Sequence, residues 1–253
     1  MIGHEIIGSG PKRVIVLHGW FGDHGVWSQT YPMLDKSQFT YAFVDYRGYG
    51  SSWAISGPHT MAQISKDTIE LADGLGWNKF SLVGHSMGGM AAQRVAIDAP
   101  DRVESLVAVT PVPATGVPLP TEVLAVFEAA ATNDQAAAGV IETSLGNRLS
   151  PAFTQMVLSH KKRTVDPAVF SDYLKAFTAT NFAAEASKLK APMLVLYGQH
   201  DEGVSEALVK DVFPKLYPHA KLQVLSNAGH YPMLETPAHL VTVAEQFMAA
   251  NAR

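Results

Sequence analysis

Residues 80–89 read Phe80-Ser-Leu-Val-Gly-His-Ser-Met-Gly-Gly89 and carry the strongest structural signal in the chain. The stretch opens as a short buried strand, and an apolar helical pattern follows near residues 87–98. Between them, Gly84-His-Ser-Met-Gly88 has the form G-x-S-x-G. Glycines two residues before and after a serine leave room for the strained backbone of a sharp strand-to-helix turn. We therefore expect Ser86 to be a nucleophile; the alternative is a capping serine in a Gly-rich turn.

Short apolar runs repeat this strand-then-helix order on both sides of the turn. Continuous apolar runs, rather than alternating ones, are typical of strands buried on both faces of a parallel sheet. The expected strands cover residues 13–17, 40–44, 80–83, 105–109, 193–197 and 222–225, and the expected helices cover about 61–75, 87–98, 204–215 and 236–250. This alternation predicts an α/β fold with a mostly parallel, doubly wound sheet.

The interval 113–188 differs in kind, because it contains Ala-rich helical patterns and no strand candidate. The expected helices lie near 121–131, 134–144, 151–162 and 167–180. An insertion after strand 105–109 would overhang the carboxyl edge of the sheet, where α/β proteins bind ligands. We expect an α/β core of residues 1–112 and 189–253 with a helical cap at 113–188; the alternative is a helical cover that only packs. The run Lys161-Lys162-Arg163 is expected to be a solvated helix face.

The composition excludes several classes of protein. Of 253 residues, 47% are apolar and 17% are charged, which is enough to bury a core and excludes a disordered or coiled-coil chain. With 19 basic and 23 acidic residues, no nucleic acid is expected as a partner. The absence of cysteine excludes disulfides, thiolate metal sites and a Cys nucleophile. We expect no membrane association and a cytoplasmic location, and the sequence leaves a monomer and a homo-oligomer open.

A serine hydroxyl is a weak nucleophile without a base, so Ser86 requires a histidine. His230 follows the last expected strand in Asn227-Ala-Gly-His-Tyr-Pro232, a loop that would return over the carboxyl edge of the sheet. Among the other histidines, His160 and His219 have the pattern of surface residues. We predict that His230 is the base.

The histidine in turn needs a carboxylate that orients it. Asp201 lies four residues after strand 193–197, where it could accept a hydrogen bond from the imidazole Nδ1–H; Glu202 is the runner-up. The end of strand 105–109 reads Thr110-Pro111-Val112 and offers no carboxylate. We therefore predict that Asp201 is the catalytic acid.

Acyl transfer also needs two backbone N–H donors for the developing oxyanion. Met87 N–H, at the start of the nucleophile helix, is the first candidate. The second is Trp20 N–H in the loop His18-Gly-Trp-Phe-Gly22 after the first main strand, with Phe21 N–H as the fallback. Neighbouring aromatic residues and Met87 predict a modest apolar pocket for a small or medium acyl group. The expected pocket residues are Trp20, Phe21, Trp27, His85, Met87 and Tyr231.

Five motifs together resemble the α/β-hydrolase superfamily in order and spacing, over essentially the whole chain. They are His18-Gly-Trp20, Asp45-Tyr-Arg-Gly-Tyr-Gly-Ser51, Gly84-His-Ser-Met-Gly-Gly89, Gly198-Gln-His-Asp201 and Gly229-His230. The resemblance implies a serine hydrolase with the triad Ser86, Asp201 and His230, an oxyanion hole of the Trp20 and Met87 amides, and a helical cap. The triad mechanism requires no metal and no organic cofactor, and the sequence shows no cluster of His, Asp and Glu at metal-ligand spacing.

Two details of the resemblance concern the fold. Residues 45–51 form the family's loop after a strand, and we expect Arg47 to pair within that loop. Only Glu5-Ile-Ile7 could form a strand before Lys12, so the family's leading antiparallel hairpin must be short or partly absent. We expect about seven strands.

The expected activity is hydrolysis of a carboxylic ester or lactone, with a small-molecule ester as substrate and an acyl-enzyme intermediate. The same triad could hydrolyse a carbon-carbon bond in a diketone ring-cleavage product, but His85 stands where Asn is familiar in that group. The His18-Gly19-Trp20 loop is also similar to that of cofactor-free perhydrolases, which leaves a peroxide-dependent side reaction open. The third alternative, a non-catalytic ligand sensor, would show a broken triad or oxyanion loop, and neither is broken here.

Overall fold

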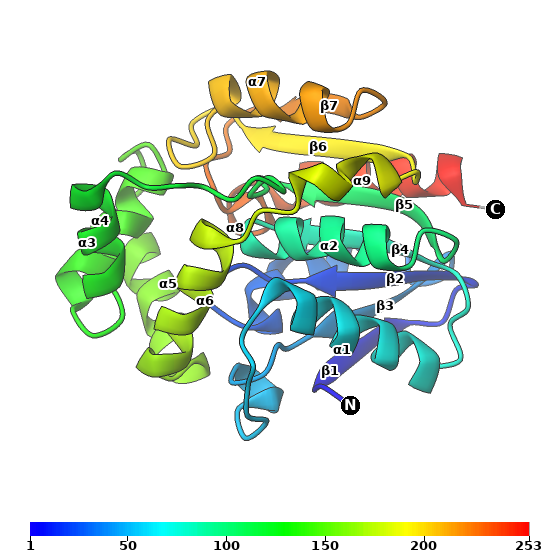
Figure 1. Ribbon diagram of the computed structural model, residues 1–253, viewed down its shortest axis with the longest axis horizontal. Coiled ribbons are helices and arrows are strands. Elements are labelled where there is room, and N and C mark those ends of the chain that lie inside the picture. The colour runs from blue at the N-terminus through cyan, green and yellow to red at the C-terminus, as the bar shows by residue number, and fades with distance from the viewer. Residues whose placement is uncertain (253) are drawn as a thin grey trace.

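The computed structural model describes residues 1–252 and is built around one seven-stranded sheet (Figure 1). The strand order is β1-β3-β2-β4-β5-β6-β7; β1 runs antiparallel to β3, and every other neighbouring pair is parallel. The strands are β1 (His4–Gly8), β2 (Lys12–Leu17), β3 (Phe39–Val44), β4 (Phe80–His85), β5 (Val103–Val109), β6 (Met193–Gly198) and β7 (Lys221–Leu225). The predicted α/β fold with a mostly parallel sheet is confirmed, and the leading strand is the short one expected.

Helices cover both faces of this sheet, which is why the central strands are continuously apolar. Every residue of β3, β4 and β6 is buried. α1 (Met61–Gly74) and α2 (Met87–Asp98) pack together on one face, and both cross in front of the strands in Figure 1. The 3-10 helix η1 (His24–Met33) and α9 (Pro237–Asn251) pack together on the other face, with the short α8 (Pro232–Glu235) against η1. α7 (Glu206–Leu216) contacts β6 and β7.

Four α-helices lie between β5 and β6, within residues 113–188, and we call this segment the helical insertion. They are α3 (Thr121–Ala129), α4 (Asp134–Ser144), α5 (Pro151–Thr164) and α6 (Pro167–Ala179). Both α5 and α6 begin with a proline in the first turn, where the backbone N–H has no hydrogen-bond partner within the helix. Figure 1 shows the four helices grouped beyond the end of the sheet toward which the arrow of β6 points.

The 3-10 helices were not expected from the sequence. Besides η1, they are η2 (Gly50–Ser52) and η3 (Ala183–Lys188). η1 contains Pro32 and buries only Val26, Trp27 and Thr30, so it has no amphipathic repeat to read. None of the helices in residues 1–252 is long and apolar enough to cross a lipid bilayer.

Lys161 corrects the expectation that residues 161–163 form a solvated face. Its side chain is buried, and Nζ donates hydrogen bonds of 2.8 Å each to the carbonyl oxygens of Ala130 and Ala131. Those carbonyls follow the end of α3, where helix oxygens have no partner within the helix. Lys162 and Arg163 are exposed, as predicted.

Arg47 corrects a second expectation. The guanidinium does not pair within the loop 45–51 but forms a two-pronged ion pair with Asp67 on α1, with N···O distances of 2.6 and 2.8 Å. A planar guanidinium matches a carboxylate in this way. The loop after β3 is thereby tied to a helix on the face of the sheet.

Candidate active site

Ser86 lies in the tight turn between β4 and α2. Its φ is 54°, in the left-handed region that non-glycine residues rarely adopt. A Cβ atom at Gly84 would collide with the Gly88 carbonyl oxygen, and one at Gly88 would collide with the His18 carbonyl oxygen. The two glycines of the G-x-S-x-G pattern are therefore required by close backbone approach.

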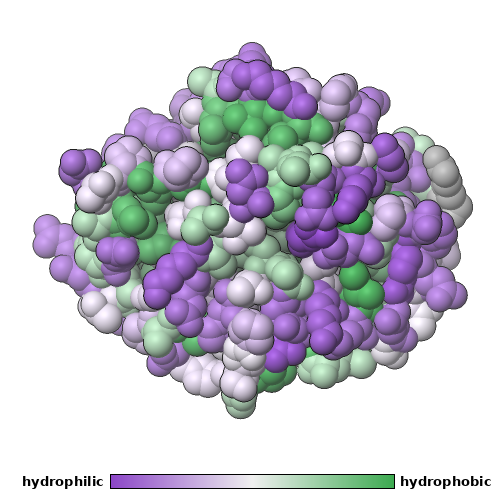
Figure 2. Space-filling model, viewed as in Figure 1, coloured by the Kyte–Doolittle hydropathy of each residue, from purple (hydrophilic) through white to green (hydrophobic). Residues whose placement is uncertain are grey.

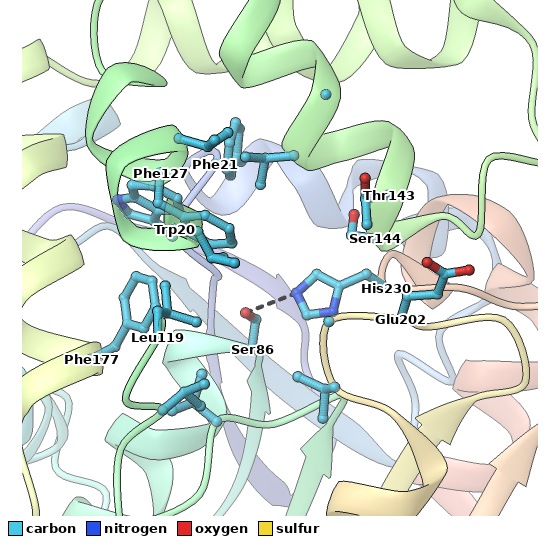
Figure 3. Close-up of a pocket in the computed structure, with 18 of the residues that line it drawn as sticks. Trp20, Phe21, Ser86, Leu119, Phe127, Thr143, Ser144, Phe177, Glu202 and His230 are labelled. Carbon is cyan, nitrogen blue, oxygen red and sulfur yellow. Dashed lines mark hydrogen bonds between the residues drawn. The ribbon is translucent and has the colours of Figure 1, made fainter. Parts of the chain in front are cut away.

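Hydrogen bonds join Ser86, His230 and Asp201 in one line. His230 Nε2 lies 2.9 Å from Ser86 Oγ (Figure 3). On its other side, His230 Nδ1 lies 2.7 Å from Asp201 Oδ2. Asp201 is buried, and its Oδ1 accepts hydrogen bonds from the Gly203 and Val204 amides at 2.9 and 2.8 Å. The structure thus brings the three residues singled out in the sequence into the geometry of a nucleophile, a base and an orienting acid.

The pKa of His230 is raised above its ordinary value. Burial lowers this pKa, but the negative charge of Asp201 and the hydrogen bond to its carboxylate outweigh that effect. A raised pKa makes the imidazole a stronger base once it has lost its proton. The electrostatics therefore suit a group that takes a proton from Ser86.

The loop that carries His230 is held through its backbone. His230 N donates to Ser144 O at 3.0 Å, and His230 O accepts from His85 Nε2 at 2.8 Å and from Thr110 Oγ1 at 3.1 Å. On either side, the Gly229 and Tyr231 amides donate to the two oxygens of the Glu235 carboxylate. Sequence reasoning missed Thr110 and Ser144 because no local pattern marks a partner that is distant in the chain, and it missed Glu235 because the fold of the loop 229–235 is not visible in its sequence.

His85 serves this loop as well as the pocket. Burial, followed by the neighbouring His230, lowers its pKa well below the ordinary value, so the ring is neutral and its Nε2–H donates to His230 O. A Cβ atom at Gly19 would lie 2.6 Å from His85 Nδ1, so the ring packs directly under the loop 18–22. His85 thus links the nucleophile turn to the base.

Tyrosine hydroxyls fix the loop 18–22 from below. Tyr46 Oη donates to His18 O, and Tyr49 Oη donates to Trp20 O, both at 2.8 Å. Burial lowers the pKa of His18 to about 4, so its ring is neutral.

No hydrogen-bond acceptor within residues 1–252 contacts the backbone N–H of Trp20 or of Met87. Both amides proposed for the oxyanion are therefore available as donors.

A buried acidic cluster lies beside this loop. Asp45 accepts hydrogen bonds from His24 N, His24 Nδ1 and Ser51 N at 2.8 to 2.9 Å. Asp23, His24 and Asp45 bring three potential metal-ligand atoms within 4.8 Å of one another. The carboxylate oxygens of Asp45 are already occupied by N–H donors, which gives this cluster a structural role in joining the loops after β2 and β3.

His160 is not the plain surface residue that its sequence pattern suggests. It lies on α5, and its Nε2 is 2.8 Å from Asp23 Oδ1. A Cβ atom at Gly22 would lie 2.5 Å from the His160 ring. Burial raises the pKa of Asp23, but the hydrogen bond and charge of His160 bring it down to about 2. This contact joins the helical insertion to the loop that follows β2.

A pocket of about 600 Å³ opens above Ser86 and His230. The expected residues Trp20, Phe21, His85 and Tyr231 line it, whereas Trp27 and Met87 are buried outside its wall. The Trp20 indole is fixed by a 2.7 Å hydrogen bond from Nε1 to Phe170 O. The helical insertion supplies most of the apolar wall, through Val117, Leu119, Val123, Val126, Phe127 and Phe177.

Part of this apolar wall reaches the surface. Figure 2 shows apolar surface over the helical insertion, at the left of the view. Val123 and Val126 of α3 line the pocket although they are 40% and 45% exposed. The pocket is therefore open to solvent along α3.

Known proteins resemble this chain over almost its full length. A model of the alpha/beta hydrolase fold family matches residues 12–237. A pimeloyl-[acyl-carrier protein] methyl ester esterase of Serratia marcescens is 26% identical over 98% of each chain, and its namesake of Nitrosomonas europaea is 27% identical over 94% of this chain and 96% of the relative.

Solved structures share the architecture. A bromoperoxidase from Bacillus anthracis has a TM-score of 0.85 at 21% identity, covering 97% of this chain and 94% of that one. The enol-lactonase from Burkholderia xenovorans LB400 also has a TM-score of 0.85, at 23% identity over 98% and 96%. At these identities the structures show the fold alone. Together with the match of the family model, the sheet order and the nucleophile turn, they establish that this chain belongs to the α/β-hydrolase family.

Proposed function

We propose that the protein is a serine hydrolase that cleaves a small to medium carboxylic ester or lactone through Ser86, His230 and Asp201. The observation that carries this proposal is the hydrogen-bonded line of these three residues at the floor of a mainly apolar pocket. The curated relatives are named as methyl ester esterases, which supports ester chemistry.

The reaction begins when His230 Nε2 takes the proton of Ser86 Oγ, which attacks the ester carbonyl carbon. The oxyanion accepts hydrogen bonds from the Trp20 and Met87 amides, each of which contributes about 3 kcal/mol to stabilising the transition state. His230 then gives its proton to the leaving oxygen, and the alcohol departs from an acyl-enzyme. Water, deprotonated by the same nitrogen, attacks the acyl carbon; His230 then gives this proton to Ser86 Oγ as the acid leaves, which restores the free serine and the neutral imidazole.

The helical insertion acts as a cap in this proposal. Its apolar side chains form most of the pocket wall and exclude water from the acyl group, while the polar atoms of the reaction stay on the sheet side. A volume of about 600 Å³ has room for an acyl chain of several carbons.

A fluorophosphonate probe and a series of p-nitrophenyl esters test the proposal. Wild type should become labelled at Ser86 and hydrolyse the short and medium esters. Ser86→Ala should lose labelling and turnover, whereas Ser37→Ala, at an exposed serine beside the amino end of β3, should retain both. Absence of labelling in wild type, or equal labelling of Ser86→Ala, would falsify the proposed mechanism. Labelling without turnover of any ester would favour the carbon-carbon hydrolase or the sensor.

A further inference from the structure

The pocket has two chemically different sides around Ser86. In Figure 3, Trp20, Phe127, Leu119 and Phe177 gather on one side of the serine. Thr143, Ser144 and Glu202 lie on the other side, with His230. Trp20, Phe127, Leu119 and Phe177 form what we call the apolar side, and Thr143, Ser144 and Glu202 form what we call the polar side. Val140 and Val204 also line the pocket close to the polar residues in the chain, and a second lining carboxylate, Glu122, belongs to α3.

The chemistry assigns one part of an ester to each side. In the proposed mechanism, His230 Nε2 must protonate the leaving oxygen, so that oxygen lies within hydrogen-bond distance of the imidazole. The alcohol part of the ester therefore extends along the side where His230 lies. The acyl chain is bonded to the same carbonyl carbon and points in a different direction. It therefore extends along the apolar side.

The polar side presents acceptors and negative charge. The Glu202 carboxylate is exposed and has no hydrogen-bond or ion-pair partner within residues 1–252. The Thr143 hydroxyl is likewise without a hydrogen bond there. Ser144 Oγ donates to Ile141 O at 2.7 Å, which leaves its lone pairs to accept. None of the described pocket residues is Lys or Arg.

We propose that the natural substrate joins an apolar acyl group to an alcohol that carries a hydrogen-bond donor facing Glu202, either the ammonium of an amino alcohol or the hydroxyls of a polyol. This inference rests on the proposed serine-hydrolase function and names the substrate class of the same site. An anionic alcohol would meet the Glu202 carboxylate with no Lys or Arg among the described pocket residues to offset it.

The test compares hexanoyl esters that differ only in the alcohol. 2-(Dimethylamino)ethanol, which is protonated at pH 7, and 3-methylbutanol have the same shape, and glycerol supplies hydroxyls. The quantity measured is kcat/KM for each ester relative to the 3-methylbutyl ester, compared between wild type and variants. Dividing the relative kcat/KM of a variant by that of wild type cancels the intrinsic reactivity of each ester.

Wild type should favour the ammonium or the glycerol ester, and Glu202→Gln should reduce the preference for the ammonium ester by about three- to five-fold, the range of a solvent-exposed ion pair. Added salt should shrink the same preference. Glu142→Gln removes an exposed carboxylate next to Thr143 that lies outside the pocket wall, and it should leave the ratio unchanged. Loss of the glycerol preference in Thr143→Val would identify the polyol as the donor.

Two outcomes overturn the inference. One is a 3-methylbutyl ester that is cleaved as well as both polar esters; the other is a polar preference that survives in both Glu202→Gln and Thr143→Val. Hydrolysis of p-nitrophenyl hexanoate separates these from failure of the proposed function. If that ester is cleaved by wild type and not by Ser86→Ala, only the assignment of the polar side fails; if it is not cleaved at all, the proposed function fails first.

Discussion

The nucleophile turn and the helical insertion place their residues in opposite ways. Ser86 is held at a strained φ of 54° between glycines that leave no space for a side chain. In α3, by contrast, no residue is buried, and pocket residues such as Val123 stand 40% exposed. Reacting atoms need fixed positions within fractions of an ångström, whereas an apolar wall needs only the right volume and polarity. Substitutions in the two regions should therefore differ in size and kind.

The largest loss of activity is expected at Asp201, in the loop that follows β6. Asp201→Asn preserves an oxygen that can accept from the Gly203 and Val204 amides but removes the charge beside His230. In a serine triad, this change costs about 10⁴-fold in kcat, because the imidazole loses its orientation and the partner of its positive form. Steady-state kinetics should show this loss with a melting temperature close to that of wild type.

Asp211→Asn, at an exposed carboxylate of α7 that pairs with Lys215, is the matched control and should keep wild-type activity. If Asp201→Asn retained more than a tenth of the wild-type kcat, Asp201 would not be the orienting acid.

The second effect is a pH dependence set by His230. Only neutral His230 can act as a base, and its pKa is raised, so kcat/KM should fall about tenfold per unit as the pH drops below a midpoint that lies above 6.5. The free energy of unfolding depends on pH in the opposite direction. Protonated His230 stabilises the fold, fully so below the pKa that His230 has in the unfolded chain, and this contribution is lost as the pH rises through its raised pKa in the folded protein. Measuring kcat/KM and melting temperature from pH 5 to 9 checks both. A flat kcat/KM profile over that range would exclude His230 as the base.

The smallest effect is expected in the helical insertion. Phe127 is only partly buried, and its ring stacks 5.7 Å from Trp20 across the pocket wall. Phe127→Ala should enlarge the acyl side and shift the best p-nitrophenyl ester toward longer chains. We expect changes in kcat/KM of about two- to five-fold and a stability loss of about 1–2 kcal/mol, below that of a fully buried Phe.

Val224→Ala, at an exposed valine of β7, controls for a general effect of losing apolar surface. An unchanged chain-length profile in Phe127→Ala would show that the insertion does not define the acyl side.

Much of the fold and of the candidate site follows from local patterns. Continuous apolar runs mark strands such as β4, because a parallel strand buried on both faces has no polar side to display. Ser86 is recognisable because a strained turn demands glycines at fixed offsets. Asp201 and His230 stand out because their loops follow predicted strands.

The partners of these residues were not predictable in the same way. Lys161 and Arg47 were misread, since a sequence does not reveal that a helix end or a distant carboxylate will lie beside a cation. His160 was read as a surface residue because its partner Asp23 is distant in the chain. Glu235 was missed although its partners Gly229 and Tyr231 are near in sequence, because only the folded loop turns their amides toward one carboxylate.

The sequence alone thus determined the α/β class and the identity of the candidate nucleophile, base and acid, because strand burial and the geometry of a strained turn depend on nearby residues. Only the tertiary structure decided which side of the pocket is apolar and which presents Glu202 and Thr143. That division depends on how α3, α4 and α6 pack beyond the edge of the sheet. Packing between segments that are distant in the chain produces no periodic pattern in the sequence.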